Sequence, residues 1–119
     1  MKNNYPKFKG KEDQFQILCA SYLDLKGITS THCPNEIKAS PQYMVKRKKM
    51  GVKSGVPDIL IFDSQKGYNG FAIELKVGYN KASQNQLNWL KDLEYRGWKT
   101  LITYSFEEFE AAIKDYFMI

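Results

Sequence analysis

The sequence predicts a single α/β domain in which a central mixed sheet is flanked by helices, and three observations support this fold class. Two apolar runs rich in strand-forming residues, 59–62 and 71–76, are separated by a polar turn. A helical pattern precedes them at 11–26, and a helix, a strand and a second helix follow them. The chain has 119 residues, which is enough for one hydrophobic core and too few for two.

The chain begins with a polar, basic segment followed by an amphipathic helix. We expect residues 1–10 to form a flexible basic arm and residues 11–119 to form the single domain. From 11 to 26, apolar residues recur at spacings of three, four and seven, which predicts one buried helix face that ends at Gly27. The predicted core positions are Phe15, Leu18, Cys19, Tyr22 and Leu25.

A strand and a basic insertion come next. Residues 28–37 suit a strand that is bent at its proline. We treat residues 38–56 as an insertion in which a short helix fits Gln42 to Lys49. Gly51 and Gly55 flank the rest of this insertion and predict a mobile lobe.

The second half of the chain completes the predicted sheet. Ser83 is a good N-cap for a helix at 84–96, with core positions Leu87, Leu90 and Leu93. Residues 98–104 alternate as a strand does, and Ser105 begins a last helix at 106–116 with an apolar stripe of Phe106, Phe109, Ile113 and Phe117. The element order is therefore an αβββαβ core with an extra C-terminal helix.

The two apolar runs are expected to form an antiparallel hairpin whose register brings two acids together. If the turn is centred on Lys66, Ile59 faces Ile73 and Asp58 faces Glu74. Directly opposite residues lie about 4.5–5.5 Å apart at Cβ. Two carboxylates at that distance repel each other unless a cation separates them, and a hard divalent metal with oxygen ligands is the usual solution.

Strand periodicity adds further groups to this pair. Side chains two residues apart share a face, so Glu74 and Lys76 point the same way while Leu75 points into the core. Two carboxylates, an ammonium and the Leu75 carbonyl can together bind a metal, orient a water and neutralise a phosphate. The alternative is a surface Asp–Glu pair with Lys76 as an ordinary salt-bridge partner. The Pro-Asp start, the apolar strand, the register and the Glu-x-Lys end together favour the metal site.

The positive charge of the chain is concentrated in one segment. The formal net charge is +5, yet residues 38–57 contain six basic residues and no acidic one. The rest of the chain is almost neutral, which is the pattern expected if a polyanion is held beside the carboxylates. The alternative is a solvated lysine-rich loop. The predicted DNA-binding residues within this segment are Lys46, Arg47, Lys48, Lys49 and Lys53.

These motifs resemble a known family. Pro57-Asp58 followed by Glu74-Leu75-Lys76 resembles the signature of the PD-(D/E)xK nucleases. The fuller pattern is similar to the VRR-NUC branch in its small, stand-alone, phage-type form, and it consists of GVPD at 55–58, IELK at 73–76, SQNQLNWL at 83–90 and Gly97. The resemblance implies a restriction-endonuclease-like fold and an endonuclease that uses Mg²⁺ or Mn²⁺.

The resemblance also implies roles for single residues. Asp58, Glu74 and the Leu75 carbonyl would hold the metal, and Glu12 on the first helix would reach it directly or through water. Asp13 is the less favoured choice for that acid. An alternative role for Glu12 is a favourable partner of the helix dipole.

Two more residues receive catalytic roles from the same resemblance. Lys76 would position the attacking water or stabilise developing charge. Gln86 would lie near that lysine and help to place water or phosphate, although an exposed helical glutamine is the ordinary alternative. Gln16 shares a helix face with Glu12, and Glu36 would border the site.

The predicted substrate is DNA. We expect structure-selective cutting, because no helix has base-reading character, and stand-alone members of this type resemble enzymes that resolve Holliday junctions. A four-way junction is two-fold symmetric, so paired cuts predict a homodimer. The alternatives are a general, toxin-like or restriction-type nuclease for duplex DNA, a DNA-binding protein without catalysis, and a plain structural protein.

The remaining composition narrows the location and the cofactors. No apolar run approaches the roughly 18–20 residues of a membrane span, and the N-terminus lacks the apolar region of a signal peptide. We therefore expect a cytoplasmic protein that is not secreted, contacts no membrane and uses no nucleotide cofactor. Cys19 and Cys33 lie far apart, which predicts reduced thiols and argues against zinc. His32 beside Cys33 leaves a nucleophile pair as a remote alternative.

Overall fold

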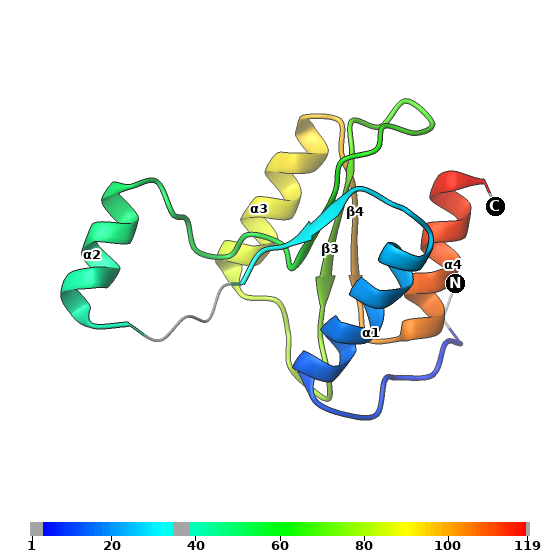
Figure 1. Ribbon diagram of the computed structural model, residues 1–119, viewed down its shortest axis with the longest axis horizontal. Helices are drawn as coiled ribbons and strands as arrows, with labels where there is room; N and C mark the ends of the chain where they lie inside the picture. The colour runs from blue at the N-terminus through cyan, green and yellow to red at the C-terminus, as the bar shows by residue number, and fades with distance from the viewer. Residues whose placement is uncertain (1–3, 35–38, 119) are drawn as a thin grey trace.

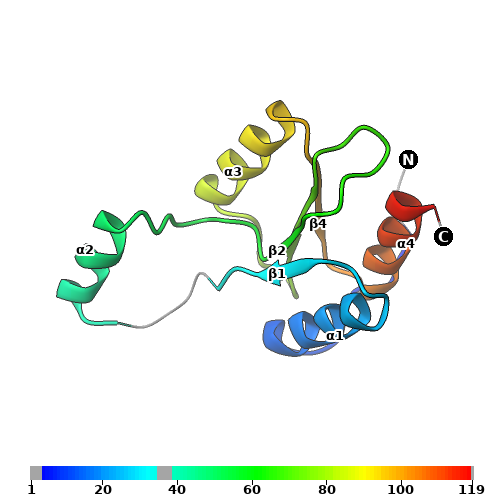
Figure 2. The same ribbon diagram turned by 45° about the horizontal axis from the view of Figure 1, so that its top comes forward.

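The computed structural model describes residues 4–34 and 39–118, which form a four-stranded mixed sheet with helices on both faces (Figures 1 and 2). The predicted element order is confirmed, and the short helix of the insertion is also present. In chain order the elements are α1 (Glu12–Leu25), β1 (Ser30–His32), α2 (Pro41–Lys49), β2 (Ile59–Ile61), β3 (Phe71–Leu75), α3 (Gln84–Tyr95), β4 (Lys99–Thr103) and α4 (Phe106–Phe117).

The strands follow the order β1-β2-β3-β4 in the sheet. The first three strands are antiparallel neighbours, whereas β4 runs parallel to β3 because α3 crosses over between them. The predicted hairpin register is confirmed, since Ile59 pairs with Ile73 and Ile61 pairs with Phe71. The first strand is shorter than the expected 28–37, and residues 35–38, which include Glu36, lie outside the described part of the chain.

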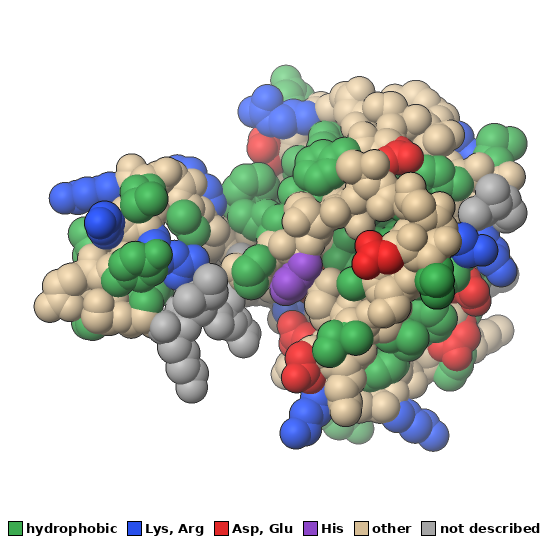
Figure 3. Space-filling view, viewed as in Figure 1, with side chains coloured by type: hydrophobic (Ala, Val, Ile, Leu, Met, Phe, Trp, Pro, Cys, Tyr) green, Lys and Arg blue, Asp and Glu red, His purple; other side chains and the backbone are tan. Residues whose placement is uncertain are grey.

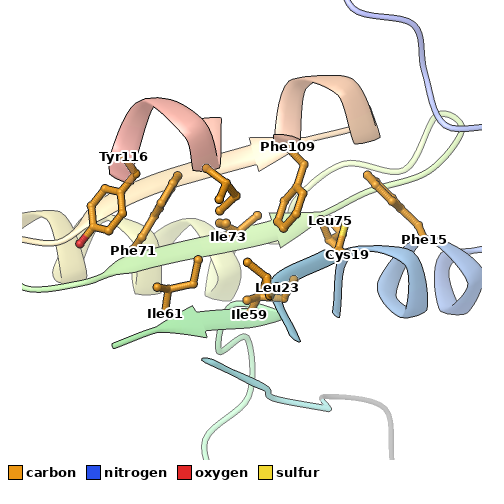
Figure 4. Close-up of a cluster of buried hydrophobic side chains, with 11 residues drawn as sticks. Phe15, Cys19, Leu23, Ile59, Ile61, Phe71, Ile73, Leu75, Phe109 and Tyr116 are labelled. Carbon is orange, nitrogen blue, oxygen red and sulfur yellow. The ribbon is translucent and has the colours of Figure 1, made fainter. Parts of the chain in front are cut away.

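The hydrophobic core lies between one face of the sheet and the helices α1 and α4. Side chains at alternate positions of β2 and β3 point toward these helices, as strand periodicity requires (Figure 4). Helix α3 covers the opposite face, where it packs on β4 (Figure 2). The buried cluster comprises Phe15, Cys19, Leu23, Ile59, Ile61, Phe71, Ile73, Leu75, Phe109, Ile113 and Tyr116.

Three leucines predicted in the core are exposed, and one that was not predicted is buried. Helix α1 buries a narrow stripe at four-residue spacing that includes Leu23, whereas Leu18 and Leu25 are exposed. The stripe is narrow because α1 packs mainly against β3 and α4. Leu87 is exposed for a similar reason, since α3 packs mainly on one strand and buries Leu90.

The segment predicted as a flexible arm is attached to the core through Phe8. Its backbone amide donates a hydrogen bond to the Tyr104 carbonyl at 2.7 Å. Its ring stacks on Phe15, with 4.7 Å between the ring centroids. These two contacts fix this part of the N-terminal segment beside α1 and β4.

Helix α2 stands away from the sheet as a separate projection (Figures 1 and 3). We call residues 39–54 the α2 lobe. Ser40 caps the helix by accepting a hydrogen bond from the Tyr43 amide, and no residue of α2 is buried. The lobe therefore owes little of its position to hydrophobic packing. Among the described helices, none combines the length and apolar character needed to cross a membrane.

Candidate active site

The β2–β3 hairpin brings Asp58 and Glu74 into direct contact through the backbone. The Asp58 amide donates to Glu74 Oε1 at 3.3 Å, and the Leu75 amide donates to Asp58 Oδ2 at 2.8 Å. These bonds continue the strand pairing by one residue beyond Ile59, which confirms the predicted approach of the two acids. Both side chains are withdrawn from solvent, because Asp58 is only 8% exposed and Glu74 only 1%.

Lys76 and Gln86 both contact the same oxygen of Glu74. Lys76 Nζ lies 3.3 Å from Glu74 Oε2, and Gln86 Nε2 donates to that oxygen at 2.7 Å. Gln86 also accepts a hydrogen bond from the Ser83 amide at 2.8 Å, which completes a capping box at the start of α3. The structure therefore brings Asp58, Glu74, Lys76 and Gln86 together as the sequence predicts.

When both are ionised, the two carboxylates carry more negative charge than the single lysine balances. Burial, and after it the negative charge of Asp58, raise the pKa of Glu74 to about 7, although Lys76 opposes both effects. Burial also raises the pKa of Asp58, although the hydrogen bond from the Leu75 amide counteracts it. Two buried acids beside one ammonium form an environment in which an added cation is favourable.

An open cleft of about 640 Å³ lies over these residues, and we call it the acidic cleft. Asp58, Lys76 and Gln86 line it from the sheet and α3, while Glu12 and Asp13 line it from the first turn of α1. The predicted acid on the first helix therefore shares a cleft with Asp58. Its direct or water-mediated contact with a metal stays a prediction, as does ligation by the Leu75 carbonyl.

The donor set fits a hard cation that takes only part of its coordination from the protein. Within residues 4–34 and 39–118, no three His, Cys, Asp or Glu side chains lie close enough to hold a metal by themselves. Mg²⁺ is commonly bound by one or two carboxylates and completes its octahedron with water and substrate phosphate. The buried Asp58–Glu74 pair, with its excess negative charge, meets that requirement.

Two further residues line the acidic cleft, and the sequence predicts no part in the proposed metal site for either of them. His32 Nδ1 donates to the Asp58 carbonyl at 2.9 Å, and the Cys33 amide donates to the same oxygen at 2.8 Å. Gln16 lines the cleft one turn after Glu12, and its Nε2 is buried without a hydrogen-bond partner among the described residues. Helical spacing alone predicts that Gln16 lies on the same face as Glu12. The position of His32 could not be predicted in this way, because it depends on how β1 pairs with β2.

Two observations argue against the remote alternative of a Cys33–His32 nucleophile pair. A cysteine nucleophile requires a lowered pKa, because the thiolate is the reactive form. Burial and the negative charge of Asp58 instead raise the pKa of Cys33. His32 directs Nδ1 to the Asp58 carbonyl rather than to the thiol.

The basic residues lie on the α2 lobe, and they divide into two groups. Arg47, Lys48 and Lys53 line a second cleft of about 670 Å³ between the lobe and α3, which we call the lobe cleft. Lys46 and Lys49 belong to the last turn of α2 but do not line that cleft. Figure 3 shows blue basic side chains around the projecting lobe. Their contact with DNA stays a prediction.

Comparison with known proteins supports the same identification. The family model of the VRR-NUC domain matches residues 10–107. A solved structure described as a VRR_NUC domain protein matches with a TM-score of 0.77 and 24% sequence identity, covering 93% of this chain and 92% of the other, which confirms the restriction-endonuclease-like fold. No curated protein matches the chain significantly. The match of the family model to most of the chain shows that the protein belongs to the VRR-NUC domain family, a family of nucleases.

Proposed function

We propose that the protein is a divalent-metal-dependent, structure-selective DNA endonuclease that hydrolyses phosphodiester bonds and resolves Holliday junctions. One observation carries the proposal: the buried carboxylates of Asp58 and Glu74 lie beside a single lysine, and Asp58 and that lysine line an open cleft. A buried excess of negative charge costs stability, so its presence in a cleft favours a functional site over a structural one.

Asp58, Glu74 and the Leu75 carbonyl would hold Mg²⁺ or Mn²⁺, with Glu12 as a direct or water-mediated partner. When bound, such an ion supplies a Lewis acid that polarises the scissile phosphate and lowers the pKa of a water. The carboxylates must be ionised to hold it. The raised pKa of Glu74, about 7, therefore predicts weaker metal binding in acid.

The other residues of the cleft hold and orient the reactants. Lys76 is the ammonium nearest to Glu74, so it can orient the attacking water or stabilise charge that develops on the phosphate. Gln86 keeps the Glu74 carboxylate in one orientation by donating to Oε2. Gln16 offers a buried amide donor without a described protein partner, and we expect it to donate to a phosphate oxygen of the substrate.

The substrate is DNA held mainly through its backbone. Lysine and arginine contacts to phosphates position a duplex without reading its sequence, and the five basic residues on the lobe suit this role. Selectivity then depends on the shape of the substrate. Since one chain carries one site and a four-way junction is two-fold symmetric, we propose a homodimer that makes paired cuts.

The test is cleavage of an end-labelled four-way junction beside a linear duplex of the same sequence, with Mg²⁺ or Mn²⁺. Wild type is compared with Asp58→Ala and Lys76→Ala, and the mass of the free and DNA-bound protein is measured by light scattering. We expect symmetric paired cuts of the junction by a dimer, weak cutting of the duplex and no cutting by either variant.

Other outcomes would contradict defined parts of the proposal. Equal cutting of both substrates would contradict junction selectivity and point to a general or restriction-type nuclease. Binding without cutting, with either metal at millimolar concentration, would contradict catalysis and leave a DNA-binding protein. A protein that stays monomeric on the junction would contradict the homodimer.

A further inference from the structure

The lobe cleft has two walls: on one side the lobe is hydrogen-bonded to α3, and on the other side α2 has no buried residue. On the α3 side, Trp89 Nε1 donates to the Ser54 carbonyl at 3.0 Å, and Asn85 Nδ2 donates to Ser54 Oγ at 2.9 Å. Gly55 packs so closely on α3 that an added Cβ would lie 2.8 Å from the Asn85 carbonyl carbon. The end of the lobe is therefore attached to α3 beside Trp89.

The opposite wall presents apolar side chains that nothing in the described chain covers well. Met44, Val45 and Val52 line the cleft and are between 46% and 56% exposed. Helix α2, which carries the first two, has no buried residue. Apolar side chains that face an open cleft favour a ligand with an apolar surface.

The charges around the cleft restrict that ligand. Arg47, Lys48 and Lys53 line the cleft, and none of the described residues that line it is acidic. Asn85 and Asn88 add side-chain amides, which can donate to and accept from the edge of a base. Cations beside aromatic and aliphatic surfaces are the combination that single-stranded nucleic acid requires, because phosphates meet the cations and base faces meet the apolar walls.

The lobe cleft adjoins the acidic cleft. Pro34 lines both of them. Along α3, Asn85 and Gln86 are consecutive, yet Asn85 lines the lobe cleft whereas Gln86 lines the acidic cleft. A DNA strand with one phosphate in the acidic cleft would therefore place a neighbouring nucleotide at the lobe cleft, which Trp89 lines.

We propose that the lobe cleft binds one unpaired nucleotide beside the scissile phosphate, with its base between Trp89 and Met44 and its phosphate at Lys48. A paired base cannot occupy this site, because its faces remain stacked in the duplex. The inference rests on the proposed nuclease function and names its substrate class: branched DNA with an unpaired nucleotide at the branch. The cavity of about 670 Å³ has room for a nucleotide.

The experiment measures base stacking without cleavage. A branched DNA carries the fluorescent base 2-aminopurine at the branch, either unpaired or opposite thymine, and binding is measured in EDTA. We expect stronger quenching of the unpaired base on binding to wild type, and at least about fivefold tighter binding than for the paired DNA.

Two matched pairs of variants on the lobe distinguish binding in the lobe cleft from general electrostatic attraction of DNA to the lobe. Met44 and Lys48 line the cleft, whereas Met50 and Lys49 lie on the same lobe outside it. We expect Met44→Ala to reduce the preference for the unpaired DNA about fivefold, and Met50→Ala to leave it within about twofold. Lys48→Ala should reduce the preference, while Lys49→Ala weakens binding of both DNAs equally.

The outcomes separate this inference from the proposed function. Equal quenching of both DNAs, or equal effects within each variant pair, would overturn the inference even if the junction is cut. Normal quenching with the expected variant pattern would support it even if no metal-dependent cutting is found. If Met44→Ala converts a dimer to a monomer and leaves the preference for unpaired DNA intact, the apolar wall is a dimer interface. That result would overturn the inference.

Discussion

Gln86 links the first turn of α3 to Glu74, because both polar atoms of its side-chain amide form hydrogen bonds. Nε2 donates to Glu74 Oε2 at 2.7 Å, while Oε1 accepts from the Ser83 amide at 2.8 Å. The residue that begins the helix therefore also fixes the orientation of a buried carboxylate. Cap stability and site geometry are coupled through one side chain.

Substituting Gln86 should reveal the two roles separately. Gln86→Ala removes both bonds, and we expect the free energy of unfolding to fall by about 1 kcal/mol at any pH. Gln86→Glu keeps the acceptor for Ser83 but places a second carboxylate against Glu74. This variant should resemble wild type at pH 5, where Glu74 is protonated, and be less stable at pH 8. Urea unfolding at both pH values is the measurement, and equal losses for Gln86→Glu at both would contradict the coupling.

The pKa of Glu74 predicts how stability varies with pH in the metal-free protein. The folded state raises this pKa from 4.5 to about 7, so folding favours the protonated acid. Stability from this group is complete below about pH 4.5 and is lost as pH rises through about 7. We expect Glu74→Gln to be more stable than wild type at pH 8, by roughly 2–3 kcal/mol at most, with no advantage near pH 4.5.

Thermal melts of both proteins in EDTA across this pH range provide the comparison. A stabilising effect that is constant with pH would mean that the titration of Glu74 is not its cause. Adding Mg²⁺ or Mn²⁺ should stabilise wild type more at pH 8 than at pH 6, because the metal binds the ionised acid, and should leave Glu74→Gln almost unchanged.

Lys76 should matter for cleavage far more than for binding. It is the ammonium in contact with Glu74 at 3.3 Å, whereas Lys81 is an exposed cation in the same cleft. We expect Lys76→Ala to lower the cleavage rate about 10²–10⁴-fold while DNA affinity changes little. Lys81→Ala removes one positive charge from the same cleft, and we expect it to lower the cleavage rate by less than about tenfold. The measurements are single-turnover cleavage rates and equilibrium DNA binding. If both variants lose the same cleavage rate, Lys76 contributes only the general electrostatic attraction of DNA.

The sequence predicts the centre of the site well, because its members lie on two local structures. Asp58, Glu74 and Lys76 belong to one hairpin, and centring its turn on Lys66 gives the observed register. Gln86 lies at a fixed position after the N-cap Ser83. Local turn and cap chemistry is sufficient to align all four.

Residues whose positions depend on distant pairing could not be predicted in the same way. His32 reaches Asp58 only because β1 pairs with β2 across 26 residues of chain. The exposure of Leu18 and Leu25 depends on where α4 covers α1, and the anchoring of Phe8 depends on β4. Each of these features follows from tertiary packing, for which helical or strand periodicity carries no information.

Of the two glycines in the lobe region, Gly51 and Gly55, we expect only Gly55 to be needed for the position of the α2 lobe. Gly51 and Gly55 both have positive φ, at +100° and +82°, so alanine is strained at either position by about 1 kcal/mol. The space around them differs. An alanine Cβ at Gly51 would meet nothing within 4 Å, whereas at Gly55 it would lie 2.8 Å from the Asn85 backbone.

We therefore expect Gly51→Ala to lower the free energy of unfolding by about 1 kcal/mol and Gly55→Ala by about 2–4 kcal/mol, because only the second must also move the lobe away from α3. Urea unfolding measures both changes, and Trp89 fluorescence reports the loss of its bond to Ser54 in the second variant alone. If the two variants lose the same free energy and keep the same fluorescence, the contact between Gly55 and α3 does not hold the lobe in place.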